Sequence, residues 1–184
     1  MSESDLWLTR LQLTADGQRL DRREWHVTIA CHAETARLLW VMPRDDLLLV
    51  QSSTPLTARM LPGLVSDAQH VKVQTLWADG TRMSLSLIAN PTVCRDGNKL
   101  FLASGQEDWF RRQLNSCVEL NQVDSQSLGV TTLQKPSGNV TFGLAVFHAT
   151  GTVTDSALLA DKIHHGIGRE KAYGAGLLLV GGLE

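Results

Sequence analysis

The order of the expected secondary structure elements constrains the fold of this 184-residue chain more than any other feature of its sequence. Each half predicts a strand, a helix, two strands, a second helix and a last strand, because period-two runs alternate with helical spacing of apolar residues. That succession is the split βαβ order of a ferredoxin-like domain, whose antiparallel sheet carries helices on one face. The sequence therefore predicts an α+β fold with two tandem ferredoxin-like (βαββαβ) domains.

The first domain is expected over residues 1–79, with a turn at residues 78–81 as its boundary. Its strands are expected at residues 6–13, 36–42, 47–52 and 71–76. Pro55 and Pro62 leave room for only a short second helix between residues 54 and 65.

The first helix is expected over residues 21–33. Asp21 is its expected N-cap, and Glu24 stands three residues later, as in a weak capping box. Trp25, Ile29 and His32 follow the spacing of one helix face, with His26 at the edge of that face.

The second domain is expected over residues 80–184. Its helices are expected at residues 106–116 and 155–165. Its strands are expected at residues 83–89, 118–123, 129–133, 141–153 and 177–180. In the helix expected over residues 106–116, the side chains of Trp109, Phe110 and Leu114 are expected to face inward.

Composition limits the kind of protein this can be. Hydrophobic residues make up 43% of the chain, enough for a sizeable core, and no apolar run approaches the roughly 20 residues of a membrane span. The acidic N-terminus lacks a signal-peptide pattern, and the three cysteines are widely spaced without a C-x-x-C pair. These features favour a cytoplasmic protein with no membrane association, no disulfide framework and no cysteine zinc site.

Charge argues against a general nucleic-acid binder. The chain has 17 Lys and Arg against 19 Asp and Glu, a formal net charge of −2. Nucleic-acid-binding domains usually have a clear basic excess. If RNA is the partner, a local group of basic residues must bind it.

A glycine-rich stretch lies near the C-terminus, at residues 166–176, with four glycines around Arg169 and Lys171. Glycines that free backbone N–H groups beside two cations suit a phosphate. A tight helix-to-strand connection explains the same pattern equally well. A dinucleotide fingerprint is excluded, because Lys171 stands where the third glycine is required and the stretch leads into an apolar run.

Four segments together resemble one known family. His165–Leu178 is similar to the C-terminal glycine-rich signature of the CasE-type CRISPR RNA endoribonucleases of type I-E systems, which belong to the RAMP superfamily. Leu48–Leu56 resembles the third strand of that family, and Ala89–Thr92 its A-N-P-T step into a basic loop. Trp109–Arg112 resembles its aromatic and basic helix motif. The family has two tandem ferredoxin-like domains, in agreement with the pattern above.

The resemblance implies an enzyme and a reaction. Members of the family cleave the repeat hairpins of precursor CRISPR RNA without a metal ion or other cofactor. The 2′-hydroxyl of the RNA attacks the adjacent phosphate and leaves a 2′,3′-cyclic phosphate. The product hairpin stays bound, and the protein remains with the other subunits of the type I-E interference complex.

The resemblance places a catalytic histidine on the first helix, at His26. Histidine suits proton transfer because its ordinary pKa of about 6.5 lies near neutral pH. Without the resemblance, the alternative interpretation is that His26 is a histidine at the edge of a helix and has no catalytic role.

One position departs from the family, which often has a tyrosine one turn before this histidine. Here that position is Arg23, a helical neighbour of His26 at i, i+3. We interpret Arg23 as a catalytic candidate, because a guanidinium can stabilise the charge of a phosphorane. A slow or inactive site and a solvated arginine are the alternatives.

Six basic residues are candidates for RNA binding, by shape and backbone contacts to a hairpin. They are Arg95, Lys99, Arg111, Arg112, Arg169 and Lys171. Ordinary surface charge is the alternative, since Asp96, Glu107 and Asp108 lie among them.

Two other functions compete with the endoribonuclease. One is a catalytically weak or inactive subunit that binds the RNA hairpin in the same complex, favoured by Arg23 and the low net charge. The other is a ferredoxin-like interaction module with no role in RNA binding. For the nuclease, we expect His26 and the glycine-rich stretch to meet at one phosphodiester.

Overall fold

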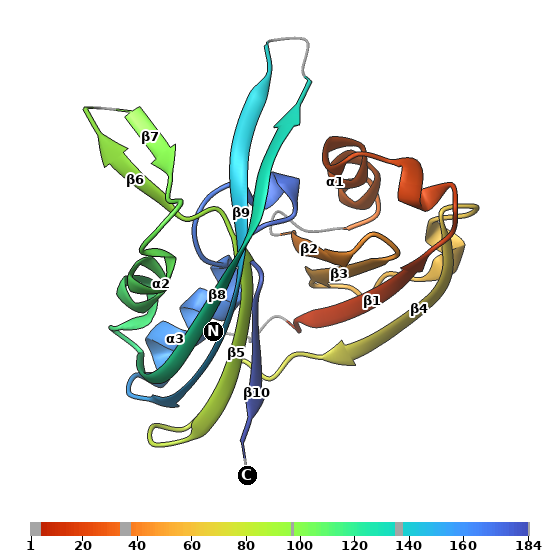
Figure 1. Ribbon diagram of the computed structural model, residues 1–184. Helices are drawn as coiled ribbons and strands as arrows, with labels where there is room; N and C mark the ends of the chain where they lie inside the picture. The colour runs from red at the N-terminus through yellow and green to blue at the C-terminus, as the bar shows by residue number, and fades with distance from the viewer. Residues whose placement is uncertain (1–4, 34–37, 97, 135–137, 184) are drawn as a thin grey trace. The chain divides into compact units, whose positions relative to one another are not determined.

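The computed structural model describes residues 5–33, 38–96, 98–134 and 138–183. The chain forms two compact units, coloured by position in the sequence in Figure 1. The first consists of Met1–Gln74 and Lys171–Gly174, and the second of Thr75–Glu170 and Ala175–Glu184. Part of the glycine-rich stretch therefore packs with the N-terminal unit.

The first unit is an antiparallel sheet in the order β2-β3-β1-β4. Its strands are β1 (Trp7–Leu13), β2 (Leu39–Arg44), β3 (Leu47–Ser52) and β4 (Val65–Lys72). The helix α1 (Arg22–Ala30) follows β1 after the short 3₁₀ turn η1 (Gly17–Arg19). Between β3 and β4 the only helical turn among the described residues is η2 (Ala58–Met60), in agreement with the two prolines in this region.

Local sequence and core packing both specify α1. The Asp21 side chain accepts from the Glu24 backbone N–H, and the Glu24 side chain accepts from the Asp21 backbone N–H, so the predicted capping box is formed. Trp25 and Ile29 are buried in the core, and the indole N–H of Trp25 donates to the Gly17 carbonyl at 3.1 Å. The expectation for His32 was wrong, because α1 ends before it and its side chain is exposed.

The second unit repeats this topology, with the sheet order β10-β5-β9-β8 and antiparallel neighbours. Its strands are β5 (Arg82–Ala89), β8 (Val118–Leu133), β9 (Val140–Val153) and β10 (Leu178–Gly182). Its helices α2 (Gln106–Leu114) and α3 (Ser156–His165) lie on the same face of the sheet (Figure 1). A hairpin of β6 (Thr92–Arg95) and β7 (Asn98–Phe101) is inserted before α2, and the 3₁₀ turn η3 (Lys171–Tyr173) precedes β10.

Aromatic packing holds α2 on this sheet. The rings of Phe110 and Phe147 stack with centroids 5.0 Å apart, and Trp109 lies 5.6 Å from Phe147. All three predicted inward residues of α2, including Leu114, are buried. The predicted fold class of two ferredoxin-like domains is confirmed.

Two strand predictions were wrong in extent. Residues 118–123 and 129–133 form one strand, β8, because the long pairing with β9 continues across register shifts at Leu120/Gln122 and Ser127/Gly129. The last strand of the first unit is β4, at Val65–Lys72, where residues 71–76 were expected. β4 pairs only with β1 in the described sheet and is mostly exposed, so its sequence lacks the alternation typical of a half-buried strand.

Candidate functional site

The helix α1, which carries the candidate residue His26, contacts the C-terminal glycine-rich stretch. Arg22 and His26 are four residues apart, so they lie on the same side of α1. Both α1 and β2 contact η3, which begins at Lys171. Within the first unit, the first helix of the chain and a turn close to its C-terminal end therefore lie together.

Arg22 makes a contact that joins them. One terminal nitrogen, Nη1, donates to the carbonyl oxygen of Tyr173 at 3.1 Å and to that of Gly174 at 3.4 Å. Burial lowers the pKa of the Arg22 guanidinium, and the negative charge of Asp45 opposes that change. An arginine remains protonated in such surroundings, so these are charge-assisted hydrogen bonds.

Gly174 is required where it stands. It is buried with a φ of +76°, in the left-handed region, and a β-carbon there would lie 2.7 Å from Arg22 Nη1 and 2.7 Å from the Trp40 ring. Only glycine lets the backbone come this close to both side chains without strain.

His26 lies one helical turn after Arg22 and is half-buried. Its Nδ1 is covered and has no hydrogen-bond partner among the described residues. Loss of solvent lowers the pKa of His26 from its ordinary value of 6.5. The imidazole is therefore neutral at neutral pH and can accept a proton.

The other two predicted residues of the first unit lie on the same two elements. Arg23 is exposed, three residues before His26 on α1. Lys171 is half-buried as the first residue of η3. The structure thus gathers the elements that carry His26, Arg23 and Lys171, and adds Arg22, which sequence reasoning missed.

The second unit brings three of the family-like segments together. Asn90, from the A-N-P-T segment, forms an isolated antiparallel bridge with Arg169 of the glycine-rich stretch. The Gly176 N–H donates to the Ile88 carbonyl at 2.7 Å. A β-carbon on Gly168 would lie 3.4 Å from the ring of Trp109, the first residue of the aromatic and basic motif.

The predicted RNA-binding residues of the second unit are in different surroundings. Arg111 donates from Nη1 to the Leu120 carbonyl at 3.1 Å, which ties its side chain to β8. Arg112 and Arg169 are exposed. Arg95 and Lys99 lie on β6 and β7, and their side chains are outside the part of the chain that the structure describes.

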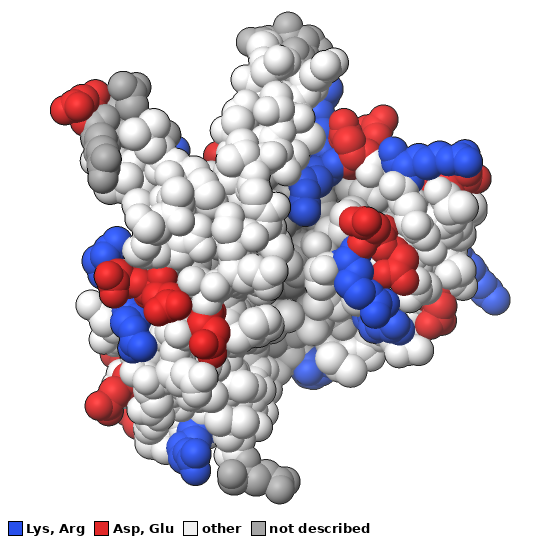
Figure 2. Space-filling model, viewed as in Figure 1, with Lys and Arg blue, Asp and Glu red and all other residues white. Residues whose placement is uncertain are grey.

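On the face shown in Figure 2, basic and acidic side chains lie interspersed. This agrees with the net charge of −2 and favours local contacts over one broad basic surface. Across the described ranges, no group of three or more His, Cys, Asp or Glu residues is arranged to hold a metal ion. None of the described helices is both long enough and apolar enough to cross a membrane.

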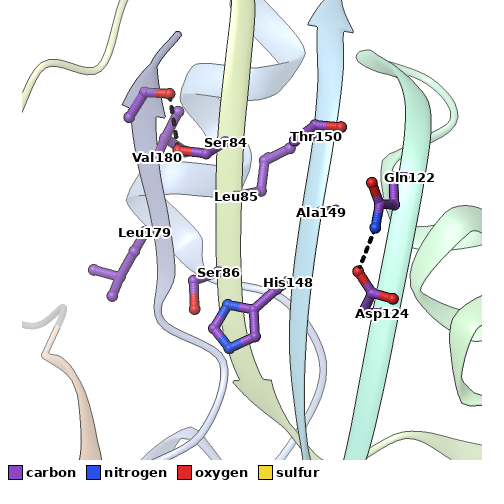
Figure 3. Close-up of a pocket in the computed structure, with 11 residues that line it drawn as sticks. Ser84, Leu85, Ser86, Gln122, Asp124, His148, Ala149, Thr150, Leu179 and Val180 are labelled. Carbon is purple, nitrogen blue, oxygen red and sulfur yellow. Dashed lines mark hydrogen bonds between the residues drawn. The ribbon is translucent and has the colours of Figure 1, made fainter.

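A shallow hollow of about 490 Å³ lies on the open face of the second sheet. Ser86, His148 and Asp124 lie in a row there, on the neighbouring strands β5, β9 and β8 (Figure 3). In the described part of the chain no hydrogen bond links His148 to either neighbour, and Asp124 accepts instead from Gln122 at 2.9 Å. The row therefore lacks the contacts by which a base activates a nucleophile.

The chain has two ferredoxin-like units, and in the first of them a histidine-bearing helix lies against a glycine-rich turn. Proteins that share these two features are the ones with which we compare it. The family model described as CRISPR associated protein matches residues 6–181, and the chain belongs to that family. No curated protein sequence matches the chain significantly.

Solved structures that share this fold include proteins named as a CRISPR endoribonuclease or as part of Cascade. The CRISPR endoribonuclease Cse3 bound to a 19-nucleotide RNA is 25% identical, with a TM-score of 0.80 over 96% of this chain and 99% of that one. Cse3 of Thermus thermophilus, bound to an RNA representing a pre-cleavage complex, is 24% identical, with a TM-score of 0.81 over 96% and 99%. A chain of Escherichia coli Cascade bound to a double-stranded DNA target is 21% identical, with a TM-score of 0.62 over 96% and 99%.

Replacing Gly174 by alanine should destabilise the protein by about 2–5 kcal/mol, because alanine is strained in the left-handed backbone conformation and its β-carbon would overlap Arg22 and Trp40. Gly63 is the matched control, because its φ is +78° but a β-carbon placed there would have no atom within 4 Å. Gly63→Ala should therefore lower the free energy of unfolding only through backbone strain, by about 1–2 kcal/mol. Denaturant unfolding measures both, and equal losses would contradict a close approach at Gly174.

Proposed function

We propose that this protein is an endoribonuclease that binds and cleaves the repeat hairpins of precursor CRISPR RNA. It then keeps the product hairpin as a subunit of a Cascade-type interference complex. Membership of the CRISPR-associated family supports this, as do the fold relatives, whose names include an RNA-bound endoribonuclease and a Cascade subunit. The observation that carries the proposal is the half-buried, neutral His26 on a helix that contacts the turn bearing Lys171.

The proposed reaction is an intramolecular transesterification. His26 accepts the proton of the 2′-hydroxyl, whose oxygen attacks the adjacent phosphorus and forms the new P–O bond. The P–O5′ bond breaks, the 5′-oxygen takes up a proton from water, His26 releases the proton it accepted to water, and a 2′,3′-cyclic phosphate remains. Because the nucleophile belongs to the RNA, we propose that no metal ion is needed.

Cations are needed where negative charge develops on the phosphoryl oxygens. Lys171 and Arg23 are the proposed sources, since Arg23 lies on the same helix as His26 and Lys171 lies on η3, which contacts that helix. A positive charge beside the phosphate stabilises the transition state more than the ground state, because the negative charge on the phosphoryl oxygens grows during attack.

His26→Ala should slow single-turnover cleavage of the cognate repeat RNA by about 10²–10⁴-fold, the usual worth of a positioned proton-transfer group. His32→Ala is the matched control, an exposed histidine just beyond α1 that should leave the rate unchanged. Wild-type cleavage should persist in EDTA and stop when the nucleotide before the cut carries a 2′-deoxyribose. Cleavage that requires a metal ion, or that survives the 2′-deoxy substitution, would falsify this mechanism.

The pH dependence of the rate should report the lowered pKa of His26. A base with a depressed pKa loses its function only when the pH falls through that value, so the rate should be level near neutral pH. We expect the acidic limb of the single-turnover profile to have its midpoint below 6.5, the ordinary value. A midpoint at or above 6.5, or an unchanged limb in His26→Ala, would remove the desolvated base from the mechanism.

The basic residues predicted to bind RNA remain proposals, and Arg112 gives the clearest test. It is exposed at the end of α2, whereas Arg111 is already hydrogen bonded to β8. If Arg112 contacts a phosphate, Arg112→Ala should weaken hairpin binding and reduce the slope of log affinity against log salt by about 1. Arg59→Ala, an exposed arginine on η2, is the control, and equal slopes in all three proteins would dismiss the contact.

A hairpin-binding subunit without cleavage is the second candidate. The observation that favours it is the exposed Arg23 at the position where the CasE-type family often has a tyrosine. Tight, salt-dependent binding of the repeat hairpin by wild-type protein that leaves the RNA intact selects this candidate. Absence of any salt-dependent RNA binding would instead select an interaction module.

A further inference from the structure

Arg22 makes a contact in the first unit to which the proposed reaction gives no role. This half-buried cation directs Nη1 at two main-chain carbonyls, those of Tyr173 and Gly174. We propose that Arg22 is a positioning residue, which holds Lys171–Gly174 against α1 and so places Lys171 beside the phosphate that His26 acts on. The inference rests on the proposed function.

The bonded carbonyls are at the end of a very short element. η3 is a single 3₁₀ turn, Lys171–Tyr173, closed by a hydrogen bond from the Gly174 N–H to the Lys171 carbonyl at 3.3 Å. Isolated turns of this length have little stability of their own. The contacts that anchor the last residue of the turn and the glycine after it therefore help to fix the position of Lys171.

The anchor and the proposed base belong to one rigid element. Arg22 and His26 are one turn apart on α1, whose start is fixed by the Asp21–Glu24 capping box. Holding the turn through Arg22 therefore sets the distance between Lys171 and His26. Reaction rates are sensitive to such placement, since a shift of about 1 Å in a reacting group can cost about 10²-fold.

Arginine suits this role better than lysine. Its guanidinium stays charged when half-buried and presents several N–H donors in a fixed plane. Gly174 complements it, because the absence of a β-carbon leaves the space that Nη1 occupies. The adjacent Arg23 is exposed, so the two neighbouring arginines have different surroundings.

The test is a double-mutant cycle in single-turnover cleavage of the repeat hairpin, with Arg22→Ala, Lys171→Ala and the double variant. We expect Arg22→Ala to slow cleavage at least about tenfold while changing hairpin affinity less than about threefold. In the Lys171→Ala background the same change should slow cleavage less than about twofold, because the residue being positioned is already absent. Losses that multiply independently would overturn the inference.

Arg19→Ala is the matched control. Arg19 is an exposed arginine of the same unit whose contact is a surface ion pair with Asp16 at 2.9 Å. It should leave both the rate and the affinity unchanged. Arg22→Lys keeps the charge without the planar donors, so it should fold and still cleave more slowly than wild type; a wild-type rate in Arg22→Lys would overturn the need for the guanidinium.

Hydrogen exchange separates this inference from the proposed function. In Arg22→Ala and Arg22→Lys the amides of residues 171–174 should exchange at least about tenfold faster, whereas those of β3 should keep wild-type protection. If the wild-type protein cleaves no RNA but the Arg22 variants show this local change, the proposed function fails and the anchoring by Arg22 stands. Unchanged exchange at residues 171–174 in both variants overturns the anchoring, whatever the RNA result.

Discussion

The hydrogen bonds from Arg22 to the Tyr173 and Gly174 carbonyls are the interaction on which the candidate site depends. They tie a turn near the C-terminus to the first helix, and β2 also contacts this turn. The approach is possible because residue 174 has no side chain and because the Trp40 ring and the guanidinium occupy the space instead. A main-chain contact, made possible by one glycine, thus joins residues 151 and 152 positions apart.

This arrangement explains how a chain with a net charge of −2 can act on RNA, as proposed. Basic and acidic side chains are interspersed on the visible face, so no broad positive surface gathers the ligand there (Figure 2). A few cations on defined elements must supply the local field. Arg22 remains charged and lies one helical turn from His26, but its Nη1 already donates to two carbonyls. The residues that we propose to contact the phosphate are therefore other cations than Arg22.

Much of the fold could be predicted, because each element has its own local signal. Asp21 and Glu24 formed the capping box that their spacing indicated, and Asp155 caps α3 by accepting from the Leu158 N–H. The strand over Leu47–Ser52 was predicted with its observed bounds. The continuous β8 was not predicted, since a strand mostly exposed to solvent has weak alternation and is held by pairing with β9.

The sequence by itself determined the order of the elements, the capped start of α1 and the family to which the chain is similar, since these depend on neighbouring residues and short motifs. It also pointed to His26 and Lys171 as residues of interest. It could not distinguish the roles of Arg22 and Arg23, because adjacent arginines have the same chemistry until the helix packs against something. Tertiary structure decided that Arg22 is half-buried and bonded to Tyr173 and Gly174 whereas Arg23 is exposed, because the angle at which α1 presents its side chains is set by the burial of Trp25 and Ile29.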